Sequence, residues 1–203
     1  MSARLFAALP LPEHVSTDVT RVLNAVPADV RMSEQLRWVR REMWHVTLAF
    51  FGDVAEERQP ELEERLGRVS SKHEALLLGL RGAGAFRSAV AAHAVWIGIA
   101  NDAASQGEQP LRRERSPLVS VAESCAAAGR RVGLDLAVKP FRPHLTLARA
   151  KGRTSVDVRP FVNALAGYEG PSWTASEIVL MRSHLGPDPW YEPVGTWPLG
   201  YQA

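Results

Sequence analysis

The chain has 203 residues, of which 46% are hydrophobic and 23% are charged, and its formal net charge at pH 7 is +2. This composition is typical of a globular protein with one compact domain or two small lobes. A net charge so small gives no support for a protein that coats nucleic acid through bulk electrostatics. No apolar run reaches the roughly 18 residues of a membrane span, and the single cysteine, Cys125, excludes an internal disulfide.

The start of the chain predicts a strand rather than a secretion signal. Its apolar stretch ends at Pro10 and runs directly into strand-like sequence, which is too short for the apolar core of a signal peptide. We therefore expect a cytoplasmic protein.

In the first half of the chain, short strands alternate with amphipathic helices. Helical spacing of apolar residues is found in two segments, 13–26 and 56–73. Runs typical of strands cover residues 4–9, 36–39, 44–51, 76–80 and 94–100. Glycines between the last two strands predict a loop there.

The second half of the chain repeats this order. The polar segment 101–117 is predicted to be a flexible surface loop. After it we expect helices over 118–132 and 156–166, and strands over 144–148, 173–184 and 191–199. Intermixed helices and strands with several strand–turn–strand joins favour an α+β fold with antiparallel sheets. The repeated order indicates an internal duplication.

One short motif occurs twice. Residues 45–49 read His-Val-Thr-Leu-Ala and residues 144–148 read His-Leu-Thr-Leu-Ala. Because side chains alternate along a strand, His45 shares a face with Thr47, as does His144 with Thr146. A single such pair is most simply explained as the polar face of a strand. Two copies in matching contexts favour one site that joins two imidazoles and two hydroxyls.

These residues resemble the two-histidine phosphoesterase superfamily, whose signature is a pair of His-x-Thr-x motifs. The wider sequence is similar to its RNA 2′,3′-cyclic phosphodiesterase branch, also called 2′–5′ RNA ligase. The matching stretches are residues 4–8, 44–53, 141–149 and 178–193. The resemblance implies two pseudo-symmetric lobes around a central cleft, with one motif in each, so that residues 1–203 form a single bilobal domain.

Opening a cyclic phosphate with water needs a base for the water and an acid for the leaving oxygen. Histidine serves both roles near neutral pH because its ordinary pKa is about 6.5. The resemblance implies that His45 is the proton donor, that His144 is the proton acceptor, and that the product is a 2′-phosphate. The residues alone leave the reversed assignment open. Hydroxyls of Thr47 and Thr146 are suitable donors to the phosphate oxygens.

Two further residues are candidates for substrate binding. Phe51 has the strand parity of His45 and could stack on the terminal base, although a place in the core is as plausible. Arg149 could bind phosphate, but its parity is opposite to His144, so the strand must bend or end there. His184, next to a Gly-Pro turn, could also border the cleft. No metal-binding motif is present, and we expect neither a metal nor another cofactor.

The expected substrates are RNA 3′ ends or small cyclic nucleotides, and the expected state is a monomer without an obligatory protein partner and without membrane attachment. Three alternatives remain: a ligase that runs the same chemistry in reverse through a 2′–5′ linkage, a module that binds RNA ends or nucleotides without turnover, and a structural protein with a duplicated fold. A pure binder needs no acid–base pair, and a structural role leaves the polar strand faces unexplained.

Overall fold

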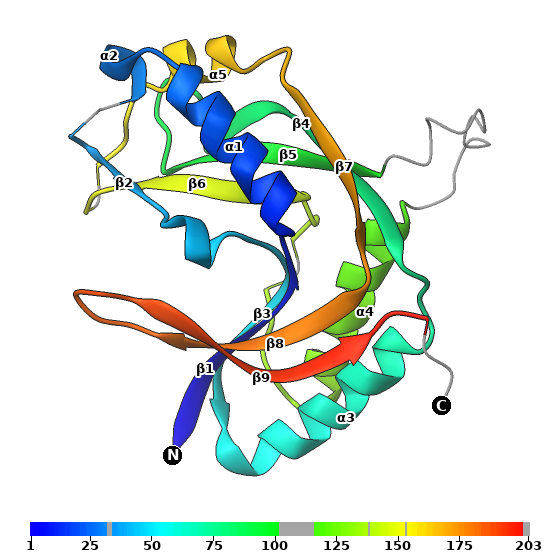
Figure 1. The fold of residues 1–203 in the computed structure, drawn as a ribbon. Coiled ribbons are helices and arrows are strands. Elements are labelled where there is room, and N and C mark those ends of the chain that lie inside the picture. The colour runs from blue at the N-terminus through cyan, green and yellow to red at the C-terminus, as the bar shows by residue number, and fades with distance from the viewer. Residues whose placement is uncertain (32–33, 102–115, 138, 153, 201–203) are drawn as a thin grey trace.

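The computed structural model describes residues 1–31, 34–101, 116–137, 139–152 and 154–200 (Figure 1). The predicted flexible loop over 101–117 lies almost entirely outside these residues. The strands are β1 (Ser2–Pro10), β2 (Leu36–Trp38), β3 (His45–Ala55), β4 (Leu76–Phe86), β5 (Ala94–Asn101), β6 (His144–Ala150), β7 (Glu169–Ala175), β8 (Glu177–His184) and β9 (Trp190–Pro198). The α-helices are α1 (Glu13–Ala25), α2 (Ala28–Arg31), α3 (Gln59–Ser70), α4 (Pro117–Arg131) and α5 (Arg159–Ala164), and short 3-10 turns are η1 (Arg41–Met43) and η2 (Glu56–Arg58).

The described strands form one strongly curled sheet in the order β7-β4-β5-β6-β3-β1-β8-β9, with β2 paired to β6. All neighbouring strands are antiparallel, which confirms the predicted α+β class. The order is symmetric about the junction of β6 and β3, where only one residue pair, Val46 with Leu145, is in register. Apart from β2, each half of the sheet therefore has four described strands in an equivalent order.

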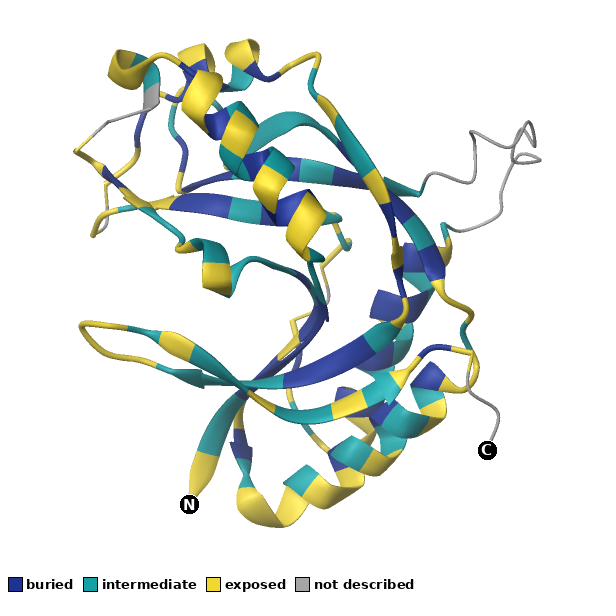
Figure 2. Ribbon diagram, in the orientation of Figure 1, coloured by how far each residue is buried: buried dark blue, intermediate teal, exposed yellow. Residues whose placement is uncertain are grey.

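Two helices cross between the halves. Helix α1 follows β1 but packs near β7, whereas α4 follows β5 but packs on β3. We call β1, β3, β8 and β9 with α3 and α4 the β3 lobe, and β4–β7 with α1, α2 and α5 the β6 lobe. In Figure 2, α1 and α3 bury one side and expose the other, as their amphipathic sequences predict.

Two predicted segments differ from the observed structure. The single strand expected over 173–184 is two strands in opposite halves of the sheet: β7 pairs with β4, whereas β8 lies between β1 and β9. The loop expected after residue 80 is instead part of β4, which continues to Phe86. Gly84 makes this possible: a Cβ there would lie 2.3 Å from Cη2 of Trp96, so only glycine lets the indole lie across the strand.

Cys125 belongs to the core. It is fully buried on α4, and burial raises the pKa of its thiol to about 12. A thiol that stays protonated is a small apolar residue rather than a nucleophile. None of the described helices is both long and apolar enough to cross a membrane.

Candidate active site

The two repeated motifs meet where the lobes join. His45 begins β3 and His144 begins β6, and the next residues, Val46 and Leu145, form the one pair that links these strands. Continuing this antiparallel register by one residue sets His45 opposite Thr146 and Thr47 opposite His144. The fold thus brings together the four residues that the sequence singles out.

Both motifs contain an irregularity at the same position. Ala7 pairs with Ala49 and Ala8 with Thr47, so Leu48 has no partner across β1. In β6, Val95 of β5 pairs with Ala148 and Trp96 with Thr146, which leaves Leu147 unpaired. An extra residue of this kind is a β-bulge, and beyond it the two faces of the strand exchange. Side chains after each bulge therefore point to the face opposite the one that simple alternation predicts.

Both imidazoles are anchored in the same way. Nδ1 of His45 lies 2.8 Å from the carbonyl oxygen of Met43, and Nδ1 of His144 lies 2.7 Å from that of Arg142. A carbonyl only accepts, so each Nδ1 carries the proton and donates it. Nε2 is therefore the atom that gains or loses a proton on both rings. The anchors are backbone atoms two residues before each histidine.

The neighbours of the two Nε2 atoms differ. Nε2 of His45 is 3.0 Å from Oγ1 of Thr47, which donates to it when the ring is neutral. Within the described part of the chain, the Thr146 hydroxyl has no hydrogen-bond partner in the protein, so it is free to donate to a ligand.

Aromatic rings surround both histidines. The ring of His45 lies 4.8 Å from Phe6 and 5.2 Å from Tyr191. The ring of His144 lies 4.7 Å from Phe86 and 6.3 Å from Trp96. These apolar neighbours exclude water and therefore disfavour the charged imidazolium.

The pKa values of both histidines are lowered, mainly by this desolvation. Burial lowers the pKa of His45 to about 4, with smaller contributions from the positive charges of Arg149 and His144. Burial also lowers the pKa of His144, again helped by Arg149. In the free protein both imidazoles are therefore neutral near pH 7.

Arg149 lies on the histidine face of β6. The bulge at Leu147 turns its side chain to the side of His144, and its charge acts on both histidines. Simple alternation placed Arg149 on the face opposite His144, and the bulge at Leu147 brings it to the same face. An exposed guanidinium beside two imidazoles can bind a phosphate oxygen.

Phe51 does not line the site, and the expectation that it could stack on a base is not met. Its side chain is 5% exposed and faces α4, where a Cβ on Gly129 would lie 2.8 Å from its ring. The bulge at Leu48 explains the change of face. The aromatic residue on the histidine side is Phe50, which pairs with Phe6, is 47% exposed and lies under the guanidinium of Arg4. Phe50 occupies the place in β3 that Arg149 occupies in β6.

A pocket of about 590 Å³ adjoins His45 on the side of α1 and η1. Tyr191 and Met181 form one wall, and the paired side chains of Glu13 and Arg41 lie at another. His184 is not among the lining residues. Its ring stacks on Trp190 and its Nε2 is 2.8 Å from a carboxylate oxygen of Glu192. That hydrogen bond and the stacking on Trp190, both on the β8–β9 hairpin, explain His184 without a role at the site.

Among the described residues, no group of three or more His, Cys, Asp or Glu side chains is close enough together to hold a metal ion.

Two His-x-Thr strands that meet at the centre of a pseudo-symmetric antiparallel sheet define a two-histidine phosphoesterase. The chain belongs to the 2′–5′ RNA ligase superfamily, whose family model matches residues 12–187.

Named relatives cover most of the chain. A Thermus thermophilus protein named RNA 2′,3′-cyclic phosphodiesterase is 33% identical and covers 91% of this chain and 83% of its own length. A Geobacillus stearothermophilus protein of the same name is 32% identical over 96% of this chain, which spans 56% of that relative. One from Methanothermobacter thermautotrophicus is 27% identical and covers 92% of this chain and 93% of its own length.

Solved structures show the same fold. The Thermus thermophilus protein TT0787 superposes with a TM-score of 0.74 at 24% identity, covering 98% of this chain and all of its own. Escherichia coli LigT in complex with 3′-AMP gives a TM-score of 0.72 at 24% identity, covering 99% of this chain and all of its own.

Proposed function

We propose that this chain hydrolyses 2′,3′-cyclic phosphodiester ends of RNA to 2′-phosphomonoesters, with His45 and His144 as the acid–base pair. The observation that carries the proposal is the matched pair of imidazoles. Both are anchored through Nδ1, both keep Nε2 for proton transfer, and they lie on adjacent strands. Relatives named RNA 2′,3′-cyclic phosphodiesterase support the same activity.

In this mechanism water attacks phosphorus and the bond to the 3′ oxygen breaks. Nε2 of His144 takes the proton of the attacking water, while Nε2 of His45 gives its proton to the leaving 3′ oxygen. A 2′-phosphate results. Because water has given a proton to His144 and His45 has given one to the 3′ oxygen, the two imidazoles have exchanged protonation states. Acid–base chemistry at two imidazoles suffices for this step without a metal ion.

Binding of the substrate raises the pKa of His45, so that this histidine can act as the proton donor. The donor must be protonated, yet His45 in the free protein has a pKa of about 4. A bound phosphodiester brings a negative charge close to the ring and opposes both desolvation and the charge of Arg149. The pKa of His45 therefore rises when substrate binds, which restricts the active protonation state to the complex.

The other proposed contacts to the substrate come from side chains on the same face of β3 and β6 as the two histidines. Hydroxyls of Thr47 and Thr146 donate to the non-bridging oxygens from opposite lobes, where negative charge grows in the transition state. Arg149 binds the same phosphate from β6. Phe50 offers an exposed ring for the terminal base.

The test uses an RNA oligomer that ends in a 2′,3′-cyclic phosphate, with and without EDTA. We expect phosphorus NMR to show a 2′-phosphate in both conditions, and His45→Ala and His144→Ala each to lose orders of magnitude in rate. Saturable binding without turnover would replace the proposal by a binding module. Turnover that survives both substitutions would place the chemistry elsewhere.

The roles of the two histidines are separated by a substrate whose bridging 3′ oxygen is replaced by sulfur. A thiolate leaves without protonation, so the sulfur substrate restores activity to the variant that lacks the acid. We expect rescue of His45→Ala and none of His144→Ala. Rescue of His144→Ala alone would reverse the assignment.

Further properties are part of the same proposal. We place the enzyme in the cytoplasm as a monomer built from one duplicated bilobal domain. Cell fractionation checks the compartment, and light scattering on the purified protein checks the oligomeric state. An RNA with a 5′-hydroxyl end, added to the product, tests whether the reverse reaction forms a 2′–5′ linkage.

A further inference from the structure

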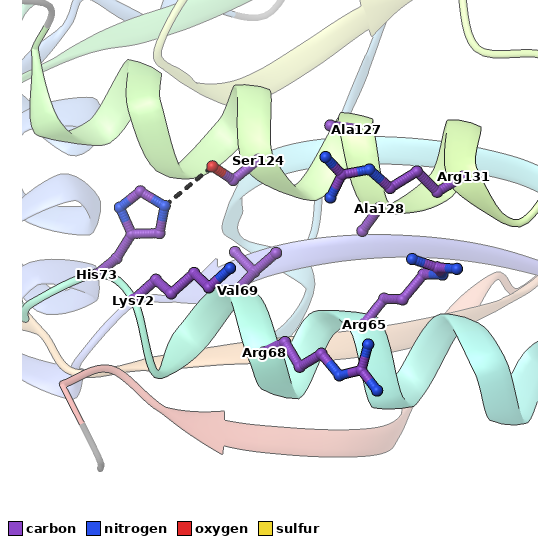
Figure 3. A pocket seen from close by; sticks show the side chains of 9 residues that line it. All are labelled: Arg65, Arg68, Val69, Lys72, His73, Ser124, Ala127, Ala128 and Arg131. Carbon is purple, nitrogen blue, oxygen red and sulfur yellow. Dashed lines mark hydrogen bonds between the residues drawn. The ribbon is translucent and has the colours of Figure 1, made fainter.

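A second hollow lies between α3 and α4, on the side of β3 that faces away from the histidines. Helix α4 packs on the face of β3 that carries Phe51, whereas His45 and Thr47 occupy the other face. The hollow is a groove of about 330 Å³ between the two helices, lined by Arg65, Arg68, Val69, Lys72, His73, Ser124, Ala127, Ala128 and Arg131 (Figure 3). It shares no residue with the pocket beside His45.

The groove exists because one helix presents small side chains to it. On α4 the residues Ser124, Ala127 and Ala128 recur at helical spacing and form the floor with Val69. At one end Nε2 of His73 is 3.0 Å from Oγ of Ser124, which closes the groove there. The floor is thus largely apolar, and the rim carries the charge.

The rim carries four permanent cations. Arg65 and Arg68 are one turn apart on α3, Lys72 follows in the turn just after α3, and Arg131 comes from α4 (Figure 3). None of the nine described lining residues is acidic. Four positive charges around one hollow stand out in a chain whose net charge is +2. A hollow lined by one sign of charge concentrates ions of the opposite sign.

Two of the four cations already pair with a carboxylate of the protein, and two do not. Arg65 is 2.6 Å from a carboxylate oxygen of Glu61, and Arg68 pairs with Glu64, both along α3. Each arginine keeps further N–H donors beyond these exposed pairs. Lys72 and Arg131 form no ion pair with any residue that the structure describes. These two charges are therefore open to an external anion.

The shape of the rim selects the class of anion. From Arg65 to the end of α3 at Ser70 the helix rises about 7.5 Å, and Lys72 follows beyond that end, so the row of cations is longer than one phosphate group. No Phe, Tyr or Trp is among the described lining residues, and the imidazole of His73 is held by Ser124 at one end, so the groove offers no broad stacking platform for a base. Such a site suits consecutive phosphates without reading sequence.

We propose that the α3–α4 groove binds the sugar–phosphate backbone of a single RNA strand at a distance from its reacting 3′ end. The assignment of RNA rests on the proposed function. The groove then adds affinity for long RNA that a small cyclic nucleotide does not receive.

The test replaces the two unpaired cations in the variant Lys72→Gln/Arg131→Gln. Its matched control is Arg130→Gln/Lys151→Gln, which removes the same charge. Arg130 is exposed on α4 but does not line the groove, and Lys151 is exposed just after the end of β6. Binding is measured by fluorescence anisotropy with a single-stranded RNA that ends in a 3′-hydroxyl. Because this probe cannot react, its binding is informative even if the chain turns over no cyclic phosphate.

We expect the groove variant to bind the RNA roughly five- to tenfold more weakly than the control, since exposed charge contacts are individually small. The slope of log affinity against log salt concentration should fall by about 1.4, because each lost contact to a single strand removes about 0.7. The kcat and KM for a mononucleoside 2′,3′-cyclic phosphate should match those of the control.

Equal RNA affinity in the groove variant and the control overturns the proposal. Two further probes are tripolyphosphate and phosphatidylglycerol vesicles. The proposal is also overturned if the groove variant loses affinity for one of these probes while its affinity for RNA stays equal to that of the control. The groove would then serve a free polyanion or a membrane surface instead.

Discussion

Phe50 and Phe51 are neighbours in sequence, but we expect replacement of Phe51 by alanine to reduce stability and replacement of Phe50 to weaken substrate binding. Phe51→Ala removes a ring that is 5% exposed and packed on Gly129, and such a loss in a core costs about 3–5 kcal/mol of unfolding free energy. At about 2–4 °C per kcal/mol for a chain of this size, the Tm should fall by roughly 6–20 °C. The kcat and KM of the protein that remains folded should stay close to wild type.

Phe50→Ala should leave stability nearly intact and weaken substrate binding. The ring is 47% exposed, and its contact with the guanidinium of Arg4 is worth about 0.5–1 kcal/mol. Stacking of a base on an aromatic ring contributes about 1–3 kcal/mol, so the KM for RNA should rise roughly 5- to 150-fold. Phe50→Tyr keeps an aromatic face and serves as the control, with an unchanged KM.

Thermal unfolding by circular dichroism and turnover of an RNA 2′,3′-cyclic phosphate, measured well below each Tm, separate the two effects. A Phe51→Ala protein with normal Tm and raised KM, beside a destabilised Phe50→Ala protein, would show that the strand alternates without a bulge at Leu48. The assignment of faces in β3, and by symmetry in β6, would then be wrong.

Three further outcomes follow from the site. Arg149→Gln removes the proposed phosphate contact and a charge that lowers the pKa of both histidines. We therefore expect kcat/KM to fall by about tenfold or more and the acidic limb of its pH profile to move to higher pH. His45 has a pKa of about 4 in the folded protein against an ordinary 6.5, so between these pH values the unfolded state binds more protons than the folded state. The free energy of unfolding should therefore fall by up to about 3 kcal/mol as the pH drops from 6.5 to 4. Urea unfolding measured at both pH values should show a smaller loss in His45→Gln. Gly84→Ala puts a methyl group 2.3 Å from the Trp96 ring, which contacts His144, so both Tm and kcat should fall; an unchanged Tm would contradict the close packing seen there.

Local patterns in the sequence were sufficient for most of the secondary structure and for the core of the site. Helical spacing predicted α1, α3 and α4 to within a few residues at each end, and alternation placed His45 and Thr47 on one face of β3. These features depend on neighbours within one or two turns or pleats, which a single sequence displays.

Other parts of the site depend on features that leave no such signal. A bulge adds a residue without changing composition, so the exchange of faces that buries Phe51 and exposes Phe50 could not be seen. The anchors of the imidazoles are carbonyl groups, which every residue carries. The rings of Phe6 and Tyr191 reach His45 from strands at the two ends of the chain, and only the fold brings them together.

The position of β1 has a consequence for synthesis on the ribosome. One edge of β1 pairs with β3, which follows soon after it, but the other edge waits for β8, which begins at residue 177. A nascent chain therefore carries an open edge on β1 until β8 has been translated, and open edges invite association with other chains. The ring of Tyr191, on β9, also reaches His45 only after β9 has been made, so the aromatic surroundings of His45 are completed after those of His144.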